Sequence, residues 1–322
     1  MESVKNIFQI VAKRVAFGCL TVFIISILTF FGVEALPGDT ATAVLGQDAT
    51  EETLAAFRKE LKLDQPMHQR YISWLFGFIS GELGNSFASG RPIKEFIGWR
   101  LENTLFLAVM ASLFAVPLSL ALGLLQALYR NSWFDRSTSI ASLSMISFPE
   151  FFIAYILILL FSVKLEWFPT MSAVMTDTTI GSRFYFLVLP CLTLTFVISA
   201  HIMRMTRASI INVLNSAYIE MAQLKGLNRL RIYAVHALPN ALSPIINIVI
   251  LNLAYLVVGV VIVEVVFVYP GLGQLMVDSV SKRDLPVIQA CGMIFAATYI
   301  FMNMMADILS ILCNPKLRNP RT

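Results

Sequence analysis

Three acidic residues lie inside long apolar stretches of the sequence, at Glu150, Glu264 and Asp307. A carboxyl group surrounded by hydrocarbon is costly, so such residues usually face a polar partner, a cavity or a pathway. Glu150 directly follows Pro149. It could meet a cationic part of a substrate, whereas the structural alternative is a partner for backbone groups that a proline kink frees. For Glu264 we expect a gate or scaffold role rather than direct substrate contact. Asn303 stands one helical turn before Asp307, which favours a hydrogen bond between helices.

The common signatures of enzyme sites are missing from the sequence. It contains no Gly-x-x-x-x-Gly-Lys-Ser/Thr loop for nucleotide phosphates and no Gly-x-Ser-x-Gly nucleophile turn. His68, His201 and His236 stand far apart, without the His-Glu-x-x-His spacing of a zinc site. We therefore expect no catalytic residue, no metal site and no cofactor held by this chain.

The composition is that of a membrane protein. Hydrophobic residues make up 57% of the 322 residues and charged residues only 14%, a balance that a soluble domain of this size rarely shows. A bilayer core needs roughly 20 apolar residues in a helix. Six stretches meet that length, and they predict an all-α protein with six transmembrane helices: Val15–Leu36, Leu105–Tyr129, Thr138–Val163, Phe184–Met203, Leu242–Val268 and Pro286–Leu312.

The distribution of Lys and Arg predicts the orientation of these helices. With the N-terminus in the cytoplasm, the inner segments carry thirteen basic residues and the short outer loops carry four. The remaining seven lie in the long segment after the first helix, where the positive-inside rule has little force. Both termini are therefore expected on the cytoplasmic side of the membrane.

This topology divides the chain into four parts. The first apolar run is longer than a signal-peptide core, so we expect it to be retained. The parts are residues 1–36 with the first helix, residues 37–100 as a periplasmic segment with short amphipathic helices, residues 101–312 as a five-helix core, and residues 313–322 as a cytoplasmic tail. Within the core, residues 204–239 form a long cytoplasmic loop.

That loop has an unusual order of residues. Glu220-Met-Ala222 is followed after three residues by Gly226, and after nine more by His236-Ala-Leu-Pro239. A short helix over Tyr218–Lys225 is expected to end at Gly226, which tolerates a positive φ, and Pro239 is expected to close the loop. A rigid transverse helix between two spans would make a lever. The alternative is an ordinary basic inner loop.

The loop resembles the EAA motif of ABC importer permeases, and His236–Leu242, HALPNAL, is similar to its peptide-importer version. Other stretches resemble the dipeptide, oligopeptide and nickel permeases of binding-protein-dependent transport systems. They are Leu63-Asp64-Gln-Pro66, Tyr71 and Trp74, Gly81-Glu-Leu-Gly84-Asn-Ser86, Glu264-Val-Val-Phe267, Pro270-Gly-Leu-Gly273 and Arg283-Asp284-Leu-Pro286. The sequence departs from the family pattern at Ala217, where an acid is usual, and at Glu82 and Lys316.

The resemblance implies the type I ABC importer permease fold in a bacterial inner membrane. It implies that Glu220 makes a charged contact with an ATPase, that Ala222 is a close-packing position and that Gly226 forms the turn. Tyr218, His236 and Pro239 would belong to the same coupling loop. Apart from the resemblance, the place of Glu150 and Glu264 inside apolar stretches assigns them to the substrate pathway or its gate.

The expected partners are two ATP-binding cassette subunits, which would bind the ATP, a second related permease, a periplasmic substrate-binding protein and membrane lipid, but no nucleic acid. Peptide is the expected cargo, with nickel, glutathione or opines as alternatives. A self-sufficient secondary transporter would usually show paired halves with broken helices, and no such duplication is evident.

Overall fold

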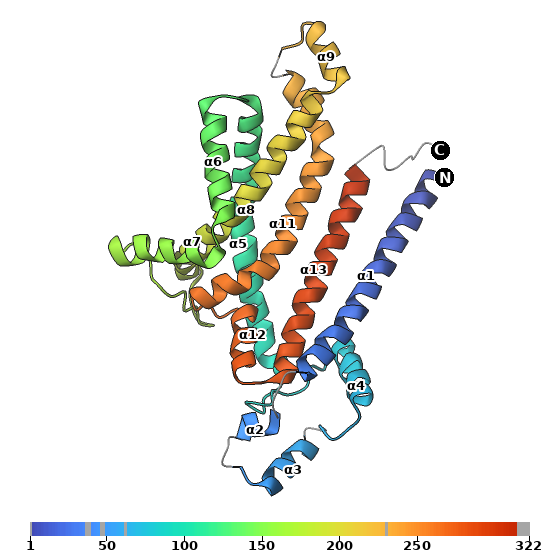
Figure 1. Ribbon diagram of the computed structural model, residues 1–322, viewed down its shortest axis with the longest axis vertical. Coiled ribbons are helices and arrows are strands. Elements are labelled where there is room, and N and C mark those ends of the chain that lie inside the picture. Colours follow the sequence, from blue (N-terminus) through green and yellow to red (C-terminus); the bar gives the residue numbers. More distant parts are fainter. Residues whose placement is uncertain (1, 36–39, 46–48, 61–62, 229–230, 314–322) are drawn as a thin grey trace.

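The computed structural model describes residues 2–35, 40–45, 49–60, 63–228 and 231–313. Most of these residues are helical (Figure 1). The α-helices are α1 (Glu2–Glu34), α2 (Thr40–Leu45), α3 (Glu51–Glu60), α4 (Met67–Ser80), α5 (Ile93–Leu128), α6 (Trp133–Ser147), α7 (Glu150–Leu157), α8 (Ile180–Leu214), α9 (Ala217–Leu224), α11 (Leu238–Val266), α12 (Leu272–Ser281) and α13 (Leu285–Cys313). Two π-helical turns, η1 (Ile158–Lys164) and η2 (Ile232–Ala237), continue α7 and precede α11.

The long helices form a bundle with α8 inside it. Helix α8 packs against α5, α6 and α11, while α13 packs against α11 and α1 (Figure 1). In the most apolar window of α8, 67% of the residues are buried, compared with 11% in α1. Gly123 of α5 allows close approach to α8, because a Cβ there would lie 2.7 Å from the carbonyl oxygen of Met203. Small residues commonly serve this purpose where membrane helices meet.

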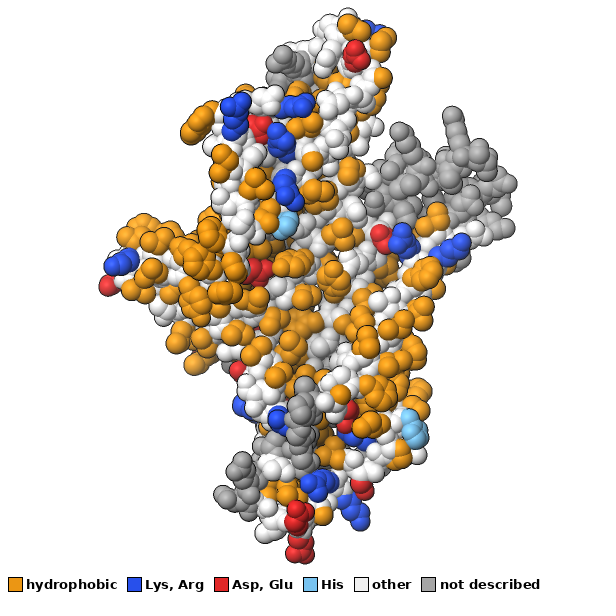
Figure 2. All heavy atoms as spheres, viewed as in Figure 1, with side chains coloured by type: hydrophobic (Ala, Val, Ile, Leu, Met, Phe, Trp, Pro, Cys, Tyr) orange, Lys and Arg blue, Asp and Glu red, His pale blue; other side chains and the backbone are white. Residues whose placement is uncertain are grey.

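Charged and apolar side chains occupy different levels of the bundle. Figure 2 shows hydrophobic side chains over the middle of the visible face and most of the charged ones towards the two ends. Helix α9 lies at one end, and the start of α1 and the end of α13 lie towards that same end (Figure 1). Helices α2, α3 and α4 lie at the opposite end. We call these the α9 end and the α4 end.

The number of spans agrees with the sequence prediction, with one change of form. Among the described residues, five helices are long and apolar enough to cross a membrane, and a bent pair of helices makes a sixth if it counts as one span. The unbent helices all begin before their predicted first residues; α5, for example, begins at Ile93 rather than Leu105. Hydropathy marks only the part in hydrocarbon, whereas backbone hydrogen bonding continues through polar turns on either side.

The third predicted span is not one helix with a proline kink. The chain bends by 106° between α6 and the α7–η1 unit. Helix α7 then points away from the bundle (Figure 1). Phe148 and Pro149 between them have extended backbone. Proline has no N–H and disfavours the helical region for the residue before it, and here Phe148 adopts the extended conformation and ends α6. The carbonyl of Pro149 then accepts hydrogen bonds from Phe152 and Ile153, which starts α7.

The segment between α1 and α5 is fixed to the α4 end of the bundle. Arg70 of α4 donates two hydrogen bonds to the carboxylate of Glu34 at the end of α1. Asp284 accepts hydrogen bonds from the hydroxyl of Ser86 and from the backbone N–H of Phe87. Two motifs separated by almost 200 residues in the sequence are thus in direct contact. The tail, residues 313–322, lies outside the described residues apart from Cys313 at the end of α13.

Candidate functional site: helix α9 and two carboxyl groups

Helix α9 stands beyond the bundle on the end of α8, from which only Asn215 and Ser216 separate it. Its inner face packs on its own chain. Ile219 and Ala222 are buried against Ile232 of η2, with Leu214 and Leu227 beside them. The small side chain at Ala222 therefore packs within this loop. A larger residue there would push α9 away from η2.

The end of α9 is closed by a pair of backbone hydrogen bonds. The N–H of Gly226 donates to the carbonyl oxygen of Gln223 at 2.9 Å, and the N–H of Leu227 donates to that of Ala222 at 3.3 Å. This pairing is a Schellman motif, which requires a left-handed residue after the helix. Gly226 provides it with φ of +75°. The predicted turn at Gly226 thus has a specific geometric cause.

The outer face of α9 is exposed and mostly apolar. Tyr218, Met221 and Leu224 lie on it, and Leu224 is 76% exposed. Glu220 is exposed beside them in the first turn of the helix. Figure 2 shows hydrophobic and charged side chains together at this tip of the molecule. An apolar patch with a single carboxylate is a surface suited to a protein groove that carries a basic group.

His236 and Pro239 do not close the loop, contrary to the expectation for Pro239. The helical run begins at Ile232 and continues through Pro239 to Val266. The π-turn η2 makes this possible: the N–H of Leu238 donates to the carbonyl of Tyr233, five residues back. A widened turn relieves the clash that a proline ring makes with the preceding turn. The carbonyl oxygen of His236 instead accepts a hydrogen bond from the hydroxyl of Tyr218, at 3.3 Å.

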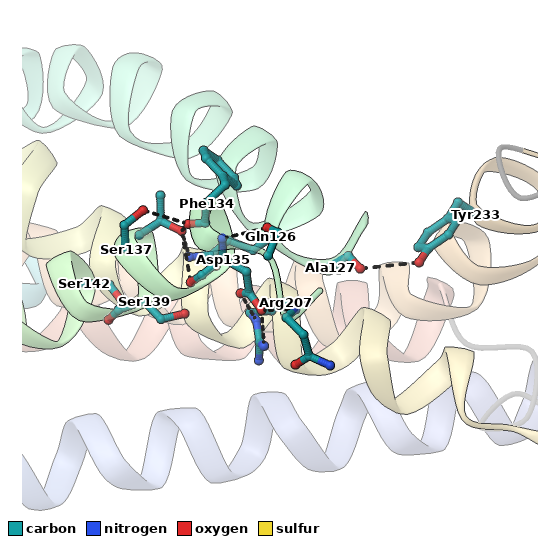
Figure 3. Close-up of polar contacts among 12 residues, drawn as sticks. Gln126, Ala127, Phe134, Asp135, Ser137, Ser139, Ser142, Arg207 and Tyr233 are labelled. Carbon is teal, nitrogen blue, oxygen red and sulfur yellow. Dashed lines mark hydrogen bonds and ion pairs between the residues drawn. The ribbon is translucent and has the colours of Figure 1, made fainter. Parts of the chain in front are cut away.

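Two contacts join this loop to the bundle (Figure 3). Arg207 of α8 donates from Nε and Nη2 to the two carboxylate oxygens of Asp135 in α6, at 2.7 and 2.8 Å. The Asp135 side chain is only 4% exposed, and it also accepts a hydrogen bond from the N–H of Asn131. The hydroxyl of Tyr233 donates to the carbonyl of Ala127 at the end of α5, at 3.4 Å. The two sides of the loop thus contact α6 and α5.

Glu264 lies near the α4 end and is completely buried. Its carboxylate accepts hydrogen bonds from Thr104 Oγ1 at 2.6 Å and from the N–H groups of Gly273 at 2.7 Å and Gln274 at 3.1 Å. The oxygen of Thr104 in turn accepts from the N–H of Leu272 at 2.8 Å. Glu264 and Thr104 together satisfy the first free N–H groups of α12. A carboxylate also interacts favourably with a helix N-terminus.

Glycine is required where α12 meets this carboxylate. A Cβ on Gly271 would collide with the carboxyl group of Glu264, and one on Gly273 would lie 2.7 Å from the Cα of Val261. The Glu-x-x-Phe and Pro-Gly-Leu-Gly motifs of the sequence are therefore two halves of one contact.

Glu150 is the first residue of α7, at the break after α6. Its Oε1 accepts a hydrogen bond from the hydroxyl of Tyr255 in α11, at 3.1 Å. Its Oε2 is buried and has no hydrogen-bond partner within the described part of the chain. Gly259 lies beside the carboxyl group, since a Cβ there would be in ordinary van der Waals contact with Oε1 at 3.5 Å.

Asp307 makes a contact between helices, as expected, and its partner is a charged residue. Its carboxylate pairs with Arg14 of α1 at 2.7 Å, and both side chains are about half exposed. The pair joins the first and last helices of the bundle.

The structure places the predicted residues in three regions. Tyr218, Glu220, Ala222, Gly226, His236 and Pro239 gather at the α9 end, Glu150 lies at the helix break, and Glu264 lies near the α4 end. Sequence reasoning counted Arg207 only as a cytoplasmic charge and passed over Asp135 and Tyr233. One signal was available for Asp135, since Ser132 three residues earlier marks a helix start; its hydroxyl accepts from the N–H of Asp135.

Two family models match the chain along nearly its whole length. "Binding-protein-dependent transport system inner membrane component" matches residues 115–319, and "Binding-prot-dependent transport system membrane comp, N-term" matches residues 7–108. The chain belongs to this family of permeases. It is the permease subunit of an ABC importer, a multi-pass protein of the bacterial inner membrane, as the sequence predicted.

Similar proteins agree with that assignment. Glutathione transport system permease protein GsiC of Escherichia coli O6:H1 is 37% identical over 308 residues, which covers 96% of this chain and 98% of that protein. GsiC of Shigella boydii serotype 4 is 36% identical over the same length. A chain of the inward-facing MetNI methionine ABC transporter has the same fold, with a TM-score of 0.54 over 68% of this chain and 96% of that one, at 16% identity.

Gly271→Ala is expected to destabilise the protein by about 1–3 kcal/mol, because the added methyl group forces Glu264 away from the N-terminus of α12. Thermal unfolding of the purified protein would measure the loss. Gly98→Ala is the control, since a Cβ there meets no atom within 4 Å and alanine is favoured inside a helix. Equal stability of the two variants would contradict the contact.

Asp135→Asn is expected to lower the free energy of unfolding by about 3 kcal/mol. The substitution removes the negative charge that accepts hydrogen bonds from Arg207 and from the N–H of Asn131. The thermal midpoint of the purified protein would report the change. Asp278→Asn, on the exposed side of α12, removes the same charge elsewhere and should leave the midpoint unchanged. An unchanged midpoint for Asp135→Asn would show that the ion pair adds little.

Proposed function

We propose that α9 is the element through which separate ATPase subunits drive this permease. The observation that carries the proposal is the division of its surface: one face packs on Ile232, and the opposite face, with Tyr218, Glu220 and Leu224, is open. In this proposal the open face enters a groove of an ATPase, Glu220 meets a basic group there, and ATP is bound and hydrolysed on the partner chains.

The contacts described above supply a path for force. Helix α9 continues α8 almost directly, and its Tyr218 is bonded to η2. Movement of α9 would therefore reach α6 through Arg207 and Asp135, and α5 through Tyr233. The proposed cycle uses two ATPases, which move two permeases between states open to opposite sides of the membrane. It places the α9 end and both termini in the cytoplasm, and a periplasmic binding protein at the α4 end.

A second, related permease would complete the pathway. Helix α7 and η1 leave the bundle at a steep angle (Figure 1) and expose apolar side chains that include Phe151, Tyr155 and Leu159. Lys164 and Glu166 follow at the far end of this arm, both exposed. Charged groups carried sideways from a membrane bundle are better accommodated by another protein than by lipid chains.

The proposed cargo is a short peptide, and glutathione, itself a tripeptide, is the first compound to test. The support is the similarity to GsiC permeases over 96% of the chain. Glu150 is assigned to the pathway and Glu264 to the scaffold of its outer mouth. The contacts of Glu264 support the scaffold role, because three hydrogen-bond donors already occupy its carboxylate.

The complete importer, reconstituted in liposomes with its ATPases, second permease and binding protein, is expected to take up glutathione or a short peptide only when ATP is supplied. Accumulation of labelled compound inside the liposomes measures this. Uptake by this chain alone, without the ATPases, would contradict the proposal. Uptake of nickel or an opine in place of peptides would correct the cargo alone.

Gly226→Asp is expected to abolish uptake while the protein still inserts, because aspartate disfavours the positive φ of the Schellman motif and brings a charge to the ATPase contact. Uptake and peptide-stimulated ATP hydrolysis by the reconstituted complex measure the effect.

Gly90→Asp is the matched control, since Gly90 has φ of +70° and equally open surroundings at the α4 end. It carries the same backbone strain and should retain uptake. Coupled ATP hydrolysis that survives in Gly226→Asp would contradict the role of α9.

A further inference from the structure

A cavity of about 340 Å³ opens at the break between α6 and α7. Its walls come from four helices: Met145 and Phe148 near the end of α6, Glu150 and Phe151 at the start of α7, His201 of α8, and Tyr255 of α11. The volume falls within the range of roughly 300–1,000 Å³ that small-molecule sites occupy. The cavity is mostly apolar, with three polar side chains from three helices converging on it.

The carboxylate of Glu150 is incompletely satisfied in this position. Tyr255 donates to one oxygen, and the other oxygen is buried without a donor among the residues that the structure describes. A carboxylate can accept about four hydrogen bonds, and leaving a buried one short of donors is costly. Tyr255 cannot supply more than its single hydroxyl hydrogen. The site therefore favours an occupant that brings several donors and a positive charge.

The surroundings select the kind of cation. No group of three or more metal-binding side chains occurs in the described part of the chain, and one carboxylate with one imidazole in a cavity this large would hold a bare metal ion poorly. The aromatic rings of Phe148, Phe151 and Tyr255 also line the cavity. Aromatic faces attract organic cations, and an ammonium group can donate three hydrogen bonds. A carboxylate lined by aromatic rings thus matches an alkylammonium group.

We infer that this cavity binds the free ammonium group of the transported compound, with the Glu150 carboxylate as its counter-charge and Tyr255 holding that carboxylate in place. The inference rests on the proposed function, because it assigns the cavity to the transport pathway. It restricts the cargo to compounds with a free amino group, such as unblocked peptides. Without the Glu150 carboxylate, a cation in this cavity would lack a compensating negative charge.

The test measures binding to the complex of both permeases and both ATPases in lipid nanodiscs, without ATP and without binding protein. The probes are trialanine and N-acetyl-trialanine, which differ at the amino end, and equilibrium dialysis gives Kd for each. The wild-type complex is expected to bind trialanine at least tenfold more tightly than the acetylated peptide. Glu150→Gln should weaken trialanine about tenfold and leave N-acetyl-trialanine unchanged, since the isosteric amide removes only the charge.

Two further variants separate this site from general effects. Asp307→Asn removes a carboxylate from another helix of the bundle and should keep the wild-type preference. Tyr255→Phe should reduce the preference without abolishing it, because the carboxylate stays but loses its positioning hydroxyl. The thermal midpoint of each complex is measured alongside, and Glu150→Gln is expected to match the wild type.

Three results would overturn the inference: no preference in the wild type, no binding of either probe, or equal weakening of both probes by Glu150→Gln. None of them bears on the proposed function. That proposal fails instead when the wild-type importer shows no ATP-driven uptake of any compound.

Discussion

Unpaired backbone groups and unpaired charges are costly in the hydrocarbon core of the bilayer. The hydrogen bonds at the helix interruptions of this protein reduce that cost. Each interruption of a helix brings its own polar partner. The N-terminus of α12 is satisfied by Glu264 and Thr104, and the carbonyl of Pro149 starts α7. At η2 a π-turn keeps the backbone hydrogen-bonded past Pro239. The backbone at these three places therefore keeps hydrogen-bond partners, whereas the Glu150 carboxylate beside one of them has a buried oxygen without a donor among the described residues.

In the proposed function, the loop that carries α9 has two requirements that oppose each other. It must stand clear of the bundle to reach a partner, and it must be stiff enough to transmit movement. The structure meets both with few residues: a small apolar cluster under α9, a Schellman motif at its end, and fixed contacts through Asp135 and Tyr233. None of these contacts uses the outer side chains of α9. Tyr218 of the outer face adds one contact within the loop, its hydrogen bond to the carbonyl of His236. In the proposed function, Glu220, Met221 and Leu224 of that face are left for the partner.

Much of this architecture was predictable from the sequence, because hydrophobic length and basic-residue placement are local properties. The spans were predicted in this way, and the short helix over Tyr218–Lys225 and its end at Gly226 followed from local residue types. The break at Pro149 was expected only as a kink. The sequence of one span does not show which other helices the two parts of that span pack against. The partners of Glu264, Asp135 and Asp307 were out of reach. Their donors lie far away in the sequence, and only the packing of helices brings them together.

The division of α9 into an inner and an outer face bears on how such transporters could diversify. Ile219 and Ala222 are buried within the loop, while Met221 and Leu224 are 55% and 76% exposed. Changes on the outer face would alter which motor the permease accepts at little cost in stability. A permease of this design could be matched to a different ATPase by replacing a few exposed side chains of α9. The transport pathway in the helix bundle would stay unchanged.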